Sequence, residues 1–339
     1  MKKIKIKYVD FWPSLNPEDF IFTKLLRKHF EVEISDNPDY IFYSLIGNKD
    51  YLNYDCVRIF YTGENFRPDF NLADYAIGFD KMNFNDRYIR FPYYLINEKE
   101  MNLAEKKHLN INNDILNNKS RFCNYVYSNS NAEKQREEFF YKLSNYKKVD
   151  SGGKFLNNIG GPIKDKFEFQ SKYKFSIAFE NTTYLGYATE KILQAFGAKT
   201  IPIYWGDPNI TEVFNGKSFI NCHDYKCFDD VIEKIKEIDN NDDLFLSMLK
   251  EPTFINKNYY KSELDNLENF LVSIFQQEYE KSFRRPRFYW GANYEKDIKT
   301  NKRIKEIIHS SKILNLYFKI KLYGLKKVVS HLLGKDKIN

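Results

Sequence analysis

The chain has 339 residues, of which 42% are hydrophobic and 29% charged, and this composition excludes disordered, collagen-like and low-complexity proteins. Its net charge of +7 is uneven, because ten of the 53 Lys and Arg residues but only two of the 46 Asp and Glu residues lie at Lys302 or beyond. The nearly neutral body argues against a nucleic-acid enzyme, which would carry its positive charge on the fold itself. A length above about 250–300 residues favours two domains, with a ligand cleft between them.

The N-terminal half alternates short apolar segments with turns and helices. Alternating apolar and polar residues in Ile4–Tyr8 predict a strand. Similar segments rich in Ile, Val, Tyr and Phe predict strands over 30–34, 40–44, 57–61, 75–79 and 122–127, and a helix is expected over 134–143. The rhythm is that of an α/β domain with a parallel sheet.

Gly, Asn and Pro concentrate between Ser151 and Pro162, which predicts a domain boundary there. Beyond it the pattern predicts strands over 173–179, 200–205 and 218–222, and helices over 189–196, 228–238 and 262–275. Two α/β units in series predict two Rossmann-like domains facing each other across a cleft. The expected organisation is an N-terminal domain at 1–150, a C-terminal domain at 151–300 and a basic helical tail at 301–339.

The tail carries apolar residues at three- or four-residue steps with lysines between them, which predicts a basic amphipathic helix. Its apolar positions are Ile304, Ile308, Leu314, Phe318, Leu322, Leu325, Val329 and Leu332. Such a helix either lies on an anionic membrane surface, the favoured interpretation, or packs its apolar stripe on the body of the protein.

Several common signatures are missing from the sequence. The cysteines, at positions 56, 123, 222 and 227, are too scattered for a disulfide framework or a structural zinc site, which favours a reducing cytosol. The sequence has neither G-x-G-x-x-G nor Asp-x-Asp. Without paired carboxylates to hold a divalent ion, protein cations must neutralise any pyrophosphate leaving group. His223 and Asp224 lack a nucleophile motif and are expected to be structural.

The segment 175–196 predicts a strand, a polar loop and the start of a helix, an arrangement that favours anion binding at the helix N-terminus. Lys191 falls in the first helical turn, where a cation opposes the helix dipole unless an anion compensates for it. The alternative is a surface lysine beside Glu190, which would then be a capping residue.

Two groups of motifs closely resemble the α-1,3/α-1,4-fucosyltransferases, especially the bacterial enzymes that make Lewis antigens. The first group consists of Phe-Glu-Asn at 179–181, Tyr-Ala-Thr-Glu-Lys at 187–191 and the segment 200–208. The second group lies earlier in the chain and consists of the segments 58–65 and 70–80. The resemblance spans about residues 57–225. It implies a GT-B architecture, GDP-β-L-fucose bound by the C-terminal domain, and transfer with inversion to an acceptor that faces the N-terminal domain.

Inverting transfer needs a carboxylate to accept the proton of the acceptor hydroxyl. Glu64 follows the predicted strand over 57–61, and the residue pattern alone favours an exposed glutamate in a turn. Its place in the Gly-Glu-Asn of the resemblance makes it the expected base. The resemblance assigns pyrophosphate stabilisation to Lys191 and Arg136 and donor contacts to Asn181, Tyr187 and Glu190. Glu180 is either a second carboxylate at the site or a structural residue at a strand end.

The sequence thus predicts a fucosyltransferase with no cofactor and no resident metal, although stimulation by a divalent metal stays open. The expected acceptor is the 3-hydroxyl of GlcNAc in Galβ1-4GlcNAc termini of lipopolysaccharide. The expected location is the inner face of a bacterial cytoplasmic membrane, contacted through the tail. The alternatives are α-1,4 regiochemistry, another nucleotide sugar on the same fold, or a non-catalytic protein that binds lipid or a polyanion.

Overall fold

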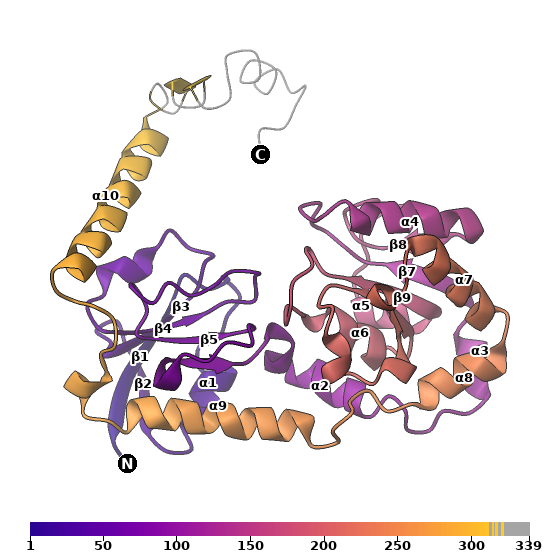
Figure 1. Ribbon diagram of the computed structural model, residues 1–339, viewed down its shortest axis with the longest axis horizontal. Coiled ribbons are helices and arrows are strands. Elements are labelled where there is room, and N and C mark those ends of the chain that lie inside the picture. Colours follow the sequence, from indigo (N-terminus) through magenta and orange to yellow (C-terminus); the bar gives the residue numbers. More distant parts are fainter. Residues whose placement is uncertain (312–313, 315, 318–319, 322–339) are drawn as a thin grey trace.

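A computed structural model describes residues 1–311, 314, 316–317 and 320–321 (Figure 1). Its first unit is a parallel sheet in the order β2-β1-β3-β4-β5-β6. The strands are β1 (Lys3–Val9), β2 (Glu31–Ile34), β3 (Tyr40–Tyr43), β4 (Val57–Tyr61), β5 (Tyr75–Gly78) and β6 (Tyr88–Arg90). The central strands β3, β4 and β5 are buried at every residue, as is usual for a parallel sheet covered on both faces.

The second unit is also a parallel sheet, in the order β11-β10-β9-β7-β8. Its strands are β7 (Arg121–Tyr125), β8 (Val149–Ser151), β9 (Tyr173–Phe179), β10 (Ile201–Trp205) and β11 (Ile220–Asn221). The domain boundary predicted at residue 150 is therefore wrong, since β7 and β8 belong to the second sheet. The Gly-rich segment after Ser151 is a loop inside this unit, and the change of sheet occurs between β6 and β7.

Helices pack against both sheets (Figure 1). They are α1 (Ile21–Leu26), α2 (Glu98–Glu105), α3 (Asp114–Asn118), α4 (Gln135–Tyr146), α5 (Lys166–Ser171), α6 (Glu190–Gly197), α7 (Phe228–Asp239), α8 (Asp242–Lys250), α9 (Tyr259–Phe275) and α10 (Trp290–Ser310). Helix α2 lies between the two units and packs against α6. One apolar cluster contains α2 residues together with residues of both units, so the units share a core.

The chain returns to the first unit in its last third. Leu267, Leu271 and Phe275 of α9 are buried in the same core as Ile4 and Tyr40 of the first sheet. The predicted C-terminal domain at 151–300 is therefore wrong at its far end as well, because α9 and the following segment complete the N-terminal unit.

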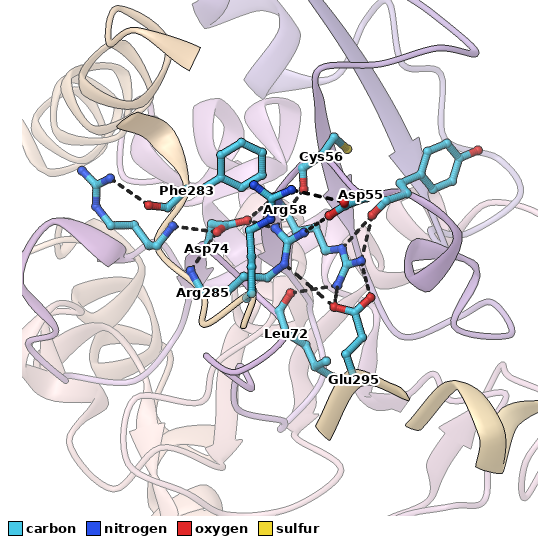
Figure 2. A network of polar contacts seen from close by, with 12 residues as sticks. Asp55, Cys56, Arg58, Leu72, Asp74, Phe283, Arg285 and Glu295 are labelled. Atoms are coloured by element: carbon cyan, nitrogen blue, oxygen red, sulfur yellow. Dashed lines mark hydrogen bonds and ion pairs between the residues drawn. The ribbon is translucent and has the colours of Figure 1, made fainter. Parts of the chain in front are cut away.

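A buried polar network fixes the segment that precedes α10, together with α10 itself, to this unit (Figure 2). Arg58 of β4 forms a two-pronged ion pair with Glu295 of α10, at 2.9 and 3.0 Å. The Asp74 carboxylate accepts hydrogen bonds from the backbone N–H of Arg58 at 2.8 Å and of Arg285 at 2.9 Å. Burial alone would raise the pKa of Glu295, but its hydrogen bond and attraction to Arg58 lower that pKa to about 2.

Helix α10 covers only the first part of the predicted tail, at residues 301–310. Helix α10 starts at Trp290, fourteen residues before the predicted apolar stripe. Ile304 is 47% exposed, and Ile308 is partly buried. The stripe positions Phe318, Leu322, Leu325, Val329 and Leu332 lie outside the described residues. Among the described helices, none is both long and apolar enough to cross a membrane.

Candidate functional site

A cavity of about 250 Å³ lies between the two units and is lined by both. The first unit contributes segments that follow β1, β3, β4 and β6, and the second contributes the β9–α6 loop and the first turn of α6. The lining residues are Trp12, Ser44, Ile46, Thr62, Gly63, Glu64, Tyr93, Asn181, Tyr187, Thr189, Glu190 and Lys191. Loops at the carboxyl ends of parallel strands are where α/β sheets place their ligands.

Lys191 is held at the start of α6 by a buried carboxylate. Its ammonium donates to Glu180 Oε2 at 2.7 Å and to Thr189 Oγ1 at 2.9 Å. Glu180 is fully buried and also accepts from the backbone N–H and the hydroxyl of Thr189, both at 2.7 Å. Burial would lower the pKa of Lys191, but the Glu180 and Glu190 carboxylates outweigh this effect and raise it. Glu180 thus stabilises the helix N-terminus beneath the cavity, while Lys191 lines it as a cation.

Arg136 lies behind the cavity wall rather than in it. This α4 residue is 1% exposed, and its guanidinium lies 4.4 Å from the centre of the Tyr127 ring. It donates to Asn181 Oδ1 at 3.0 Å, and Asn181 lines the cavity. The predicted phosphate-binding arginine is therefore placed one side chain away from the space it was expected to face.

Glu64 follows β4 in a tight turn. Its backbone N–H donates to Thr62 Oγ1 at 3.1 Å, and its carbonyl accepts from Phe66 at 2.7 Å. The residue is exposed and lines the cavity. A Cβ at position 63 would lie 2.3 Å from the Tyr93 ring, so glycine is required for the turn to approach that ring. The turn thereby directs a solvent-accessible carboxylate toward the second unit.

Tyr187 and Tyr93 contribute phenols from opposite units. Tyr187 is 2% exposed and packs edge-to-face on Phe79 at 5.2 Å. Burial raises the pKa of Tyr187 and raises that of Tyr93 to about 12, so both phenols stay neutral near pH 7. They can serve there as hydrogen-bond donors.

Two family models cover most of the chain. The N-terminal domain of α-(1,3)-fucosyltransferase FucT matches residues 6–97, and the C-terminal part of glycosyltransferase family 10 (fucosyltransferase) matches residues 116–262. The crystal structure of an α1,3-fucosyltransferase with GDP-fucose superposes with a TM-score of 0.66 at 31% identity, covering 82% of this chain and 92% of that one. The chain belongs to glycosyltransferase family 10. The predicted GT-B arrangement of two Rossmann-like units is confirmed.

Sequence relatives of the chain include longer proteins that are named as fucosyltransferases. Helicobacter pylori α-(1,3)-fucosyltransferase FucT is 36% identical over 286 residues, covering 73% of this chain and 60% of that protein. A putative fucosyltransferase, R654, of Acanthamoeba polyphaga mimivirus is 33% identical over 68% of this chain and 41% of that protein. The chain therefore spans about half of the length of these curated relatives.

Most of the predicted family 10 site residues come together. Glu64, Asn181, Tyr187, Glu190 and Lys191 line one cavity, whereas Glu180 and Arg136 contact its lining from behind.

The sequence patterns did not predict the part of the cavity wall formed by Trp12, Ser44, Ile46 and Tyr93 of the N-terminal unit. Trp12 follows the predicted strand Ile4–Tyr8, and Ser44 is the last residue of the strand predicted over 40–44. Their positions at strand ends were the available signal for the ligand edge of the sheet. Elsewhere, His223 Nε2 contacts the backbone of Gly206, at 3.2 Å from its carbonyl oxygen, and burial lowers the pKa of the imidazole. These contacts agree with its predicted structural role.

No group of three or more His, Cys, Asp or Glu side chains that could hold a metal ion occurs in the part of the chain that the structure describes.

Proposed function

We propose that the chain is an inverting fucosyltransferase that moves L-fucose from GDP-β-L-fucose to the 3-hydroxyl of GlcNAc in Galβ1-4GlcNAc acceptors. One observation carries the proposal. An exposed carboxylate from the N-terminal unit, Glu64, and a cationic helix start from the C-terminal unit, at Lys191, line the same cavity. The similarity to an α1,3-fucosyltransferase solved with GDP-fucose supports the choice of donor.

Glu64 is the proposed general base. As the acceptor oxygen attacks the anomeric carbon, its proton moves to the Glu64 carboxylate. The new glycosidic bond forms on the face opposite to GDP, so the β-linked donor yields an α-fucoside. A positioned base of this kind typically contributes about 10²–10⁴-fold to the rate.

Lys191 is the proposed stabiliser of the leaving group. The bond between the anomeric carbon and the phosphate oxygen breaks with its electron pair on that oxygen, and the developing charge meets the ammonium and the N–H groups of α6. Glu180 holds the lysine in place at 2.7 Å. Arg136 adds positive charge behind Asn181, while Glu190 and Tyr187 contact the donor from the cavity wall. None of these steps requires a metal ion.

The wider setting is also proposed. Lipopolysaccharide chains ending in Galβ1-4GlcNAc are the natural acceptors, and the protein is cytoplasmic and bound to the inner membrane surface through its basic C-terminal residues. Release from anionic vesicles after truncation at residue 311, with turnover on a soluble acceptor retained, would support this location. Equal vesicle binding by both forms would contradict it.

The decisive experiment is mass spectrometry of the products formed from GDP-fucose and N-acetyllactosamine in the presence of a chelator. The wild type is expected to add one deoxyhexose, and NMR of the product identifies the linked hydroxyl. Glu64→Gln should lower the rate by at least about a hundredfold while GDP affinity stays nearly unchanged. Glu278→Gln, at an exposed ion pair, is the matched control. Folded wild-type protein that yields no product, with or without divalent metal, would overturn the proposal.

A further inference from the structure

Arg67 connects the loop that bears Glu64 to the loop that leads into α6. It lies three residues after Glu64, and its guanidinium is 3.7 Å from the centre of the Tyr184 ring. Tyr184 belongs to the second unit, in the β9–α6 loop between Asn181 and Tyr187. The contact therefore bridges the two units beside the cavity, and stacking of a cation on an aromatic face is attractive.

The guanidinium is fixed in place from the side of the first unit. Arg67 Nε lies 2.8 Å from Asp80 Oδ2, and Nη2 donates to Asp80 Oδ1 at 3.1 Å. Nη1 donates to Asn65 Oδ1 at 2.7 Å, and Asn65 adjoins Glu64. A planar fork held at three points loses little further entropy when it stacks on a ring. Arg67 thus ties the turn containing Glu64 to the end of β5 and presents one face to Tyr184.

The partner loop rests on the same end of β5. Gly186 has a φ of +81°, and a Cβ there would lie 2.8 Å from the carbonyl oxygen of Phe79. Tyr184 and Tyr187 both pack edge-to-face on Phe79, with ring centres 6.3 and 5.2 Å away. Because this loop continues into Thr189 and Lys191, its position determines where the cationic helix start faces Glu64.

We propose that Arg67 is a positioning residue whose stack on Tyr184 sets the distance between the base loop and the donor loop. This inference rests on the proposed function and deepens it. The N-terminal and C-terminal halves of the reaction centre belong to different units, so a contact between their loops controls the alignment of base and donor. A misplacement of about 1 Å in such a site can cost about a hundredfold in rate.

Tyr184→Ala removes the bridge and leaves every hydrogen bond of Arg67 in place. We expect kcat to fall about tenfold, with GDP affinity and Tm nearly unchanged. Arg67→Ala should lower kcat by at least as much. The double variant should lose less than the product of the two single losses, because both changes break the contact between Arg67 and Tyr184. Tyr184→Phe retains the ring and should retain kcat. The control is Lys81→Ala, which breaks the ion pair between Lys81 and Glu212 of the second unit without touching either loop. An unchanged kcat in Tyr184→Ala, or an equal loss in Lys81→Ala, would overturn the proposal.

Hydrogen exchange tests the bridge without any turnover. In Arg67→Ala, the backbone amides of residues 182–187 in the other unit should exchange faster than in the wild type. In Lys81→Ala, the same amides should exchange at the wild-type rate. Unchanged exchange in both variants would overturn the proposed bridge. Absence of fucose transfer by the wild type would instead refute the proposed function, so the two failures are distinguishable.

Discussion

Two ion pairs in this molecule differ in which partner is fully buried, the anion in one pair and the cation in the other. In the cleft, the Glu180 side chain is fully buried and the Lys191 side chain is 15% exposed. Behind the N-terminal sheet, the Arg58 side chain is fully buried and Glu295 is 18% exposed. The first pair thus directs positive charge toward a cavity, whereas the second turns its cation inward.

The hydrogen-bond inventory of the two cations makes the difference sharper. An ammonium has three N–H groups, and Lys191 uses two of them on Glu180 and Thr189 among the described residues. The guanidinium of Arg58 donates all of its N–H groups to Glu295 and to the backbone carbonyls of Tyr54 and Leu72. One cation therefore has capacity left for an anionic ligand, and the other is used entirely in holding the fold.

The largest expected effect is on turnover in Lys191→Ala. Removing a preorganised stabiliser of leaving-group charge should reduce kcat by about 10²–10³-fold. Tm should fall as well, because Glu180 loses a partner, so initial rates are compared well below both melting temperatures. A variant that retains wild-type kcat would show that the cleft pair is structural, like the pair formed by Arg58.

Glu295→Gln should show the reverse pattern. It leaves the buried Arg58 guanidinium without its anion, which typically costs about 3–5 kcal/mol of folding free energy. Chemical denaturation measures this loss, and kcat on the folded protein should stay at the wild-type value. A large fall in kcat with little change in stability would remove the distinction between the two pairs.

Acid should weaken the Arg58 pair selectively. The pKa of Glu295 is about 2 in the folded protein, below its ordinary value of 4.5. Its contribution is therefore present above about pH 4.5 and is lost as the pH falls toward 2, by about 3 kcal/mol in total. The stability difference between wild type and Glu295→Gln should shrink over this range. A difference that stays constant with pH would contradict the assignment.

A third buried cation, Lys107, forms no ion pair with a carboxylate within 4 Å among the described residues, and its expected effect is smaller. Lys107 Nζ donates to the carbonyls of Met248 and Leu249 at 3.2 and 3.4 Å, and burial lowers its pKa to about 7. The unfolded chain binds more protons between this value and 10.5, so stability rises with pH there. The rise due to Lys107 is about 1 kcal/mol between pH 7 and 8. In chemical denaturation at pH 7 and pH 8, Lys107→Met should reduce the increase in the free energy of unfolding between the two pH values by that amount. An equal increase in the wild type and the variant would contradict this prediction.

Local patterns predicted the elements better than the domains. The strand expected over 173–179 and the helix expected over 189–196 correspond to β9 and α6 within one residue, because apolar spacing and turn residues act locally. The boundary at 150 failed because glycine and proline mark loops whether or not they separate domains. The return of α9 to the first sheet depends on contacts between residues far apart, such as Phe275 with Tyr40, which no local pattern encodes.

The site residues show the same difference between local patterns, which could be predicted, and long-range contacts, which could not. Glu64 and Lys191 could be predicted because each follows a strand or starts a helix in a motif that resembles a known family. The connection of Arg67 to Tyr184 could not, since residues 117 positions apart meet only after both units have folded. The buried position of Arg136 was missed for a related reason, as its contacts with Asn181 and Tyr127 depend on how α4 packs on the second sheet.

The closure of the N-terminal sheet by α9 and α10 has a consequence for biosynthesis. During synthesis, β4 leaves the ribosome more than 200 residues before Glu295. Arg58 therefore lacks its ion-pair partner while the whole second unit is made. At about 5–20 residues per second, this interval is about 10–50 seconds. During it the nascent first unit exposes the apolar surface that α9 later covers, and this surface is one that chaperones would recognise.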